Sequence, residues 1–178
     1  MKRYLTAGVL VLAAALVAKS AVSRAAMVAV ERSMGQRLEK LSVGEPFLVL
    51  SPPLGVYLEG YGAVFTAELN LVPSGITPFR PSYTKEELAR IRLKKLERLP
   101  VLKVAMREML MSSAASLDTV PPEQQLVLGV ALFHHPWEDR TGLPSQILMQ
   151  GPRRALVELH TNLRDRSAAD TVIKTQEF

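Results

Sequence analysis

The chain has 178 residues, of which 22 are basic and 17 acidic, and it contains no cysteine. The lack of cysteine excludes a disulfide framework, a thiolate metal site and a lipid-modified cysteine. With 48% apolar residues, the chain is expected to form a globular domain and not a disordered one.

The first 25 residues have the order of a secretory signal peptide. Lys2 and Arg3 precede an apolar run of 14 residues from Leu5 to Ala18, and Ser23-Arg24-Ala25 offers small residues where a signal peptidase reads the chain. We therefore expect a Sec-type signal that is cleaved after Ala25, so that the mature protein is periplasmic or extracellular in a bacterium and is not a lipoprotein. The alternative is that the segment is retained as an anchor, although a spanning helix needs roughly 20 residues.

The basic surplus of the chain lies mostly in this leader. The net charge is +5, but four of the 22 basic residues fall within residues 1–25, and the other 18 face 17 acidic residues. The mature chain would carry only +1, whereas nucleic-acid binding normally needs a strong basic surplus on the domain itself. We therefore expect no nucleic-acid partner.

Residues 26–41 are predicted to form an amphipathic helix. Its apolar side chains recur at spacings of three or four: Met27, Val30, Met34, Leu38 and Leu41. Gly44 is a suitable end for this helix. We divide the mature chain into an N-terminal helix of residues 26–44 and a single α+β domain of residues 45–178.

The next segments have the patterns of β-strands. Phe47 to Leu50 is a short apolar run that is closed by Pro52-Pro53 and suits the edge of a sheet. Residues 54–59 and 64–71 then alternate with period two on either side of Gly60-Tyr61-Gly62. Because a phosphate-binding loop leads into a helix, these glycines predict the turn of a β-hairpin instead.

The longest predicted helix begins at Thr84-Lys85-Glu86-Glu87, which has the sequence of a capping box. Its apolar face continues past Pro100 and ends near Ser112-Ser113. Because proline interrupts helical hydrogen bonding, we expect either one bent helix or two helices that abut at Pro100.

The C-terminal third predicts two strands, a helix and a last strand. Residues 126–133 are apolar on both faces, as in a central strand, and residues 146–150 form a second strand. Gly151-Pro152 opens a helix, and residues 172–178 favour a strand over a helix end. The buried side of this helix is predicted to comprise Leu156, Leu159 and Leu163.

These elements predict an α+β fold. We expect a small, mostly antiparallel sheet of about 4–6 strands, with the long helix and one or two further helices packed on one face.

The loop after the central strand holds the best candidate for a metal site. Four potential ligands lie within six residues: His134, His135, Glu138 and Asp139. Imidazole and carboxylate suit zinc or iron, but the spacing matches no standard motif, and adjacent histidines on an extended chain point to opposite faces. A metal-dependent hydrolase with a divalent cofactor and Glu138 as general base is therefore kept as an alternative. Otherwise no cofactor is predicted.

Two further features suit the binding of a partner. Tyr57 and Tyr61 are expected to form an exposed aromatic patch at the hairpin tip. Arg90, Lys94 and Arg98 recur every four residues and form a basic stripe on the long helix, which suits an acidic partner or anionic lipid headgroups.

No nucleophile elbow or phosphate-binding loop pattern is present in the sequence. The leading hypothesis is thus a non-catalytic interaction module that binds another protein of the bacterial envelope. Peripheral contact with an anionic membrane through the basic stripe is a second alternative beside the hydrolase.

Overall fold

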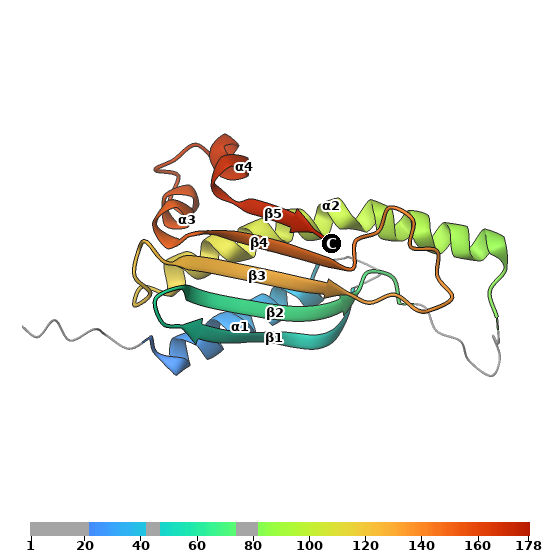
Figure 1. The fold of residues 1–178 in the computed structure, drawn as a ribbon, viewed down its shortest axis with the longest axis horizontal. Coiled ribbons are helices and arrows are strands. Elements are labelled where there is room, and N and C mark those ends of the chain that lie inside the picture. The colour runs from blue at the N-terminus through green and yellow to red at the C-terminus, as the bar shows by residue number, and fades with distance from the viewer. Residues whose placement is uncertain (1–21, 42–46, 74–81) are drawn as a thin grey trace, which may run out of the picture.

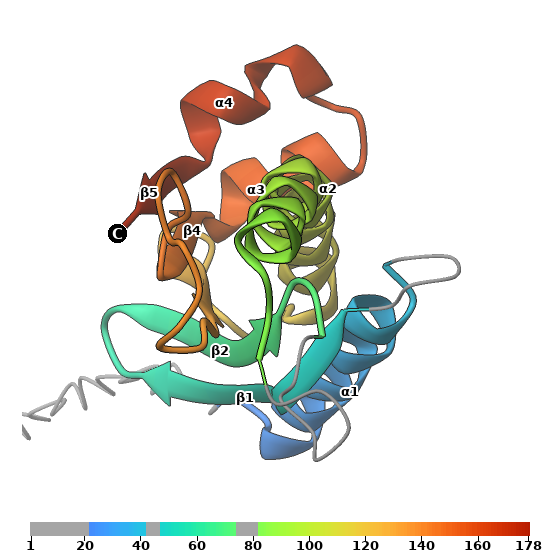
Figure 2. The same ribbon diagram turned by 90° about the vertical axis from the view of Figure 1, so that its right-hand side faces the viewer.

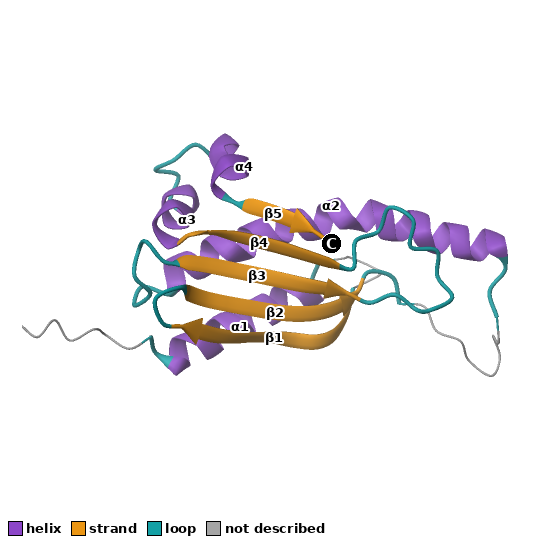
Figure 3. Ribbon diagram, in the orientation of Figure 1, coloured by secondary structure: helices purple, strands orange, loops and turns teal. Residues whose placement is uncertain are grey.

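The computed structural model describes residues 22–41, 47–73 and 82–178. The elements in chain order are α1 (Arg24–Glu39), β1 (Leu48–Leu58), β2 (Gly62–Asn70), α2 (Lys85–Ser116), β3 (Gln125–Leu132), β4 (Gln146–Pro152), α3 (Arg153–His160), the 3₁₀ turn η1 (Arg166–Ala168), α4 (Ala169–Val172) and β5 (Lys174–Glu177). The five strands form one sheet in the order β1-β2-β3-β4-β5 (Figure 1). The predicted α+β fold is confirmed, including its small sheet and its one long helix (Figure 3). The first 21 residues of the predicted leader and the predicted helix end at Gly44 lie outside the described residues.

β1 and β2 form the predicted hairpin. They pair antiparallel up to Leu58 and Gly62. Gly60 and Gly62 have φ values of 80° and 140°, which side chains other than glycine rarely adopt. Gly62 also lies against the backbone of Gln125 in β3, where a Cβ would overlap the carbonyl group. The glycines therefore serve the turn and the close packing of β2 on β3.

β1 is longer than predicted. Pro52 and Pro53 were expected to close a first strand, but β1 continues through both of them for 11 residues. Register shifts between Val49 and Ser51 and between Ser51 and Leu54 accommodate the prolines. β1 is an edge strand, so a missing backbone N–H on its outer side removes no hydrogen bond of the sheet.

β2 and β3 pair in parallel, whereas the other neighbouring strands pair antiparallel. A parallel pair requires a crossing connection, and α2 provides it. The predicted capping box is present: the Thr84 N–H donates to the Glu87 carboxylate at 2.9 Å, and the Glu87 N–H donates to Thr84 Oγ1 at 3.2 Å. α2 is a single helix of 32 residues that contains Pro100, so the alternative of two abutting helices is wrong.

The hydrophobic core lies between the helices and one face of the sheet (Figure 2). Both α1 and α2 contribute side chains that are at most 5% exposed: Met27, Val30, Met34 and Leu38 from α1, and Leu99, Leu102, Met106 and Met109 from α2. They pack against the inner side chains of the sheet, such as Phe65 and Leu128. α1 therefore shares one core with the rest of the chain.

α3 is shorter than predicted. It ends at His160, and the Thr161 hydroxyl donates back to the Val157 carbonyl at 2.9 Å. Leu156 and Leu159 are buried as expected, but the prediction for Leu163 is wrong, because this side chain lies beyond the helix end and is 82% exposed. The last strand is confirmed as β5.

The second face of the sheet carries no helix among the described residues (Figure 2). Val127 of β3 is nevertheless only 4% exposed, because it lies between Val64 of β2 and Gln150 of β4 on that face. The apolar pattern on both faces of β3 thus reflects its central position in the sheet and not two covering layers.

α1 closes the outer edge of β1 at Gly55. The Gly55 N–H donates to Glu31 Oε1 at 2.8 Å, and Arg24 Nη1 donates to the Gly55 carbonyl at 3.0 Å. Arg24 and Glu31 also pair with each other at 2.9 Å. An edge strand with free backbone groups can recruit another strand, and this ion pair occupies those groups at the middle of β1.

Gly55 is predicted to be required for this packing. A Cβ at this position would lie 2.5 Å from a ring carbon of Phe65 and 2.8 Å from the terminal methyl group of Met27. We expect Gly55→Ala to lower the free energy of unfolding by about 1–3 kcal/mol through overpacking. Gly129→Ala is the matched control, since its nearest atoms lie 3.6–3.8 Å away, and it should change stability by less than about 0.5 kcal/mol. Urea denaturation measures both, and equal losses would contradict the assignment.

Candidate functional site

A buried ion pair fastens the loop of residues 133–145 to α2. The side chains of Lys95 and Glu138 are 1% and 2% exposed, and Lys95 Nζ donates to Glu138 Oε2 at 2.5 Å. Nζ also lies 3.2 Å from the Phe133 carbonyl oxygen and 3.4 Å from His134 Nδ1. Each of the three ammonium hydrogens of Lys95 therefore has an acceptor.

His134 completes this buried cluster of Lys95, His134 and Glu138. Its Nε2 lies 3.0 Å from the Pro144 carbonyl oxygen, which can only accept, so Nε2 carries the hydrogen and Nδ1 faces Lys95 as an acceptor. Burial lowers the pKa of Lys95, because the loss of hydration outweighs the attraction of Glu138. The three side chains are at most 3% exposed, so a substrate cannot reach them. We assign the cluster a structural role.

The four residues considered as metal ligands do not converge. His134 and Glu138 belong to the buried cluster, whereas His135 stacks on Trp137 with ring centroids 4.6 Å apart. Asp139 accepts a hydrogen bond from the Thr141 N–H at 2.9 Å, which lowers the pKa of this carboxyl group. Within the described ranges, no group of three or more histidine, cysteine, aspartate or glutamate side chains could hold a metal ion. A hydrolase centred on this loop has no metal-binding geometry to support it.

Four rings connect the loop to the residue that precedes the N-cap of α2. Phe133 meets the edge of His135 at 4.8 Å between centroids, His135 stacks on Trp137, and Trp137 stacks on Tyr83 at 4.8 Å. The loop is thus held against α2 by aromatic contacts as well as by the buried cluster.

A hollow lies beside the first turns of α2, and we call it the α2 hollow. It is lined by Val72, Pro73, Tyr83, Glu87, Arg90, Ile91 and Lys94. Its volume of about 230 Å³ is below the roughly 300–1,000 Å³ of small-molecule sites and suits a single side chain. Two residues of the predicted basic stripe, Arg90 and Lys94, line it and are exposed.

Arg98, the third residue of the predicted stripe, does not join them. Its Nη1 donates to the Leu71 carbonyl oxygen, and its guanidinium lies over the Phe47 ring, 5.6 Å from the centroid. Arg98 is therefore used to attach α2 to the end of β2. The regular spacing predicted three cations on one side of the helix, but Arg98 contacts Leu71 and Phe47 instead of lining the hollow.

Tyr57 and Tyr61 do not form one patch. Tyr57 is half-buried against the core, and its hydroxyl donates to Gln124 Oε1 at 2.9 Å. Tyr61 is 43% exposed, and its hydroxyl lies 3.5 Å from Gln150 Oε1 on the uncovered face of the sheet. The two side chains thus serve opposite faces of the hairpin.

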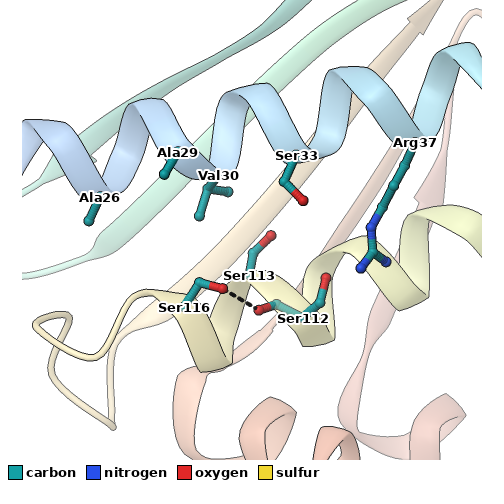
Figure 4. A pocket seen from close by; sticks show the side chains of 8 residues that line it. All are labelled: Ala26, Ala29, Val30, Ser33, Arg37, Ser112, Ser113 and Ser116. Atoms are coloured by element: carbon teal, nitrogen blue, oxygen red, sulfur yellow. Dashed lines mark hydrogen bonds between the residues drawn. The ribbon is translucent and has the colours of Figure 1, made fainter.

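A second hollow lies between α1 and α2 (Figure 4). Its polar lining comprises Ser33 and Arg37 from α1 and Ser112, Ser113 and Ser116 from α2. The α2 hydroxyl groups donate to carbonyl oxygens of their own helix, as Ser113 does to Met109 at 2.6 Å and Ser116 to Ser112 at 3.1 Å. No histidine or carboxylate is among the described residues that line this hollow, so it has no base to activate a serine.

Comparison of the chain with protein-family models, with curated proteins and with solved structures finds no match. Among the described residues, no helix is long and apolar enough to cross a membrane.

Lys95→Met is predicted to destabilise the fold by about 3–5 kcal/mol, because it leaves Glu138 buried without its partner. The double variant Lys95→Met/Glu138→Leu should recover most of that loss, since it removes both charges. Urea denaturation followed by the fluorescence of Trp137, the single tryptophan, measures unfolding beside the cluster. A double variant whose loss of stability equals the sum of the losses in Lys95→Met and in Glu138→Leu would show that the two side chains are not coupled.

Proposed function

We propose that this protein is a non-catalytic interaction module of the bacterial envelope whose α2 hollow receives an acidic segment of another envelope protein. The observation that supports this most directly is Arg90. Its exposed guanidinium lines the hollow beside Ile91 and Val72, and it has no hydrogen bond or ion pair with any other described residue.

The chemistry of the hollow suits a carboxylate next to an aliphatic side chain. A guanidinium can bind a carboxylate with two parallel hydrogen bonds, and Lys94 adds a second positive charge nearby. Ile91 is half-buried and Val72 is 8% exposed, so they offer an apolar floor for the neighbouring side chain of the partner. The hollow has room for only one side chain of the partner.

The hollow is also rigidly supported. The capping box fixes the first turn of α2, the Tyr83–Trp137 stack holds its flank, and the buried cluster fixes the helix one turn further on. A site that is ordered before binding loses less conformational entropy when the partner binds.

The separation of Arg98 from the stripe favours a protein segment over an anionic membrane. Each basic residue near an anionic lipid surface contributes about 1 kcal/mol, so Arg90 and Lys94 together would supply only about 2 kcal/mol. An acidic peptide can add the apolar contact with Ile91 to the same two charges.

Reversal of the two charges is predicted to abolish partner binding. A photoreactive amino acid at position 91 in exporting cells should form one adduct with an envelope protein, and Arg90→Glu/Lys94→Glu should reduce its yield at least about tenfold, equivalent to about 1.4 kcal/mol. Lys174→Glu is the matched control, because Lys174 is an exposed cation on β5 outside the hollow, and it should leave the yield unchanged. The yield of the adduct should also fall when salt is added, because salt screens the attraction between the charges.

An adduct that survives the double reversal, or that Lys174→Glu reduces equally, would contradict the assignment to the α2 hollow. Circular dichroism of the purified variants checks that the reversals leave the fold intact.

A further inference from the structure

β1 exposes an unusual row of aliphatic side chains for an edge strand. Leu54, Val56 and Leu58 are 58%, 54% and 46% exposed, and their alternation with Gly55 and Tyr57 places them on the uncovered face of the sheet. We call these three residues the apolar row. β1 contains no charged residue, whereas edge strands commonly use charges to prevent association.

The apolar surface continues from β1 onto α1. Val28, which is 36% exposed, and Pro52 line one groove with Leu54. Arg32 of α1 lines the same groove and is exposed. Because Glu31 and Arg24 occupy the backbone groups of Gly55, a partner cannot extend the sheet there and would meet side chains instead.

An uncharged apolar run precedes α1 closely in the sequence. The run from Leu5 to Ala18 contains no charged residue, and only residues 19–23 separate it from α1. Such a connection spans at most about 20 Å. Since Arg24 contacts Gly55, a membrane that receives the apolar run lies within reach of the apolar row.

Arg24 is part of the folded domain. It is the first residue of α1, and the Met27 N–H donates to the Ser23 carbonyl at 3.1 Å in the opening turn. Cleavage after Ala25 would remove the guanidinium that binds Gly55 and Glu31, and it would free the Gly55 carbonyl at the edge of β1. The contacts of Arg24 therefore favour a chain that keeps its N-terminal segment.

We propose that the N-terminal segment is retained as an anchor and that the apolar row, together with Val28, rests on the surface of the same bilayer. The aliphatic side chains then lie in the interfacial region, where burial of apolar area stabilises binding, and Arg24 and Arg32 face the lipid phosphates. The inference does not depend on the α2 hollow, because the α2 N-terminus lies at the opposite end of the sheet from the start of α1 (Figure 1).

The absence of cysteine allows a direct test on the full-length chain. Val56→Cys and Leu58→Cys are labelled with an environment-sensitive fluorophore and reconstituted into vesicles of phosphatidylethanolamine and phosphatidylglycerol. Val101→Cys is the matched control, because Val101 is 47% exposed but lies on α2. Spin-labelled lipid should quench the labels at positions 56 and 58 several-fold more strongly than the label at position 101, and the intact mass of the cellular protein should include Arg24.

Three results would overturn the proposal. Equal quenching at positions 56, 58 and 101 would show that the apolar row does not meet lipid. Labels at positions 56 and 58 that are shielded from both lipid and aqueous quenchers would show that protein, such as a second copy of the chain, covers the row. A cellular protein that begins at Ala26 would remove the anchor.

Discussion

The length of α2 relative to the sheet is the constraint on which the rest of the structure depends. A parallel β2–β3 pair needs a crossing connection, and a helix of 32 residues is about 48 Å long, whereas strands of 8 or 9 residues span about 30 Å. The N-terminal turns of α2 therefore extend past the end of the sheet (Figure 1). Lys95 is the first buried residue of α2. The turns of α2 that precede Lys95 extend past the sheet and are not covered by it (Figure 1).

The loop of residues 133–145 packs against the part of α2 that extends past the sheet. It extends from the end of β3 and supplies Glu138, His134 and the Phe133 carbonyl to one ammonium group. Burial of an ammonium group destabilises the fold unless each of its hydrogens has an acceptor. The cluster therefore restricts the loop to few positions relative to α2. The α2 hollow is a consequence, because the N-terminal turns of α2 leave Arg90 exposed and Ile91 half-buried near the Tyr83–Trp137 stack.

The same arrangement of helices leaves the second face of the sheet uncovered among the described residues (Figure 2). α1 and α2 both lie on one face, so β1 keeps its aliphatic side chains exposed on the other. α1 nevertheless closes the backbone edge of β1 through Arg24 and Glu31. The backbone groups of Gly55 are thus occupied, whereas the aliphatic side chains of the apolar row stay exposed on the same strand.

The sequence by itself determined the helices, the hairpin and the α+β class, because hydrophobic period, capping residues and turn glycines act over a few neighbouring residues. The same local rule placed Arg90 and Lys94 together, one helical turn apart. Only the tertiary structure decided that Arg98 binds the end of β2, that Tyr57 and Tyr61 separate, and that Glu138 pairs with Lys95. The physical reason is sequence distance: Lys95 and Glu138 are 43 positions apart, and neither spacing nor composition records that an overhanging helix and a loop meet in space.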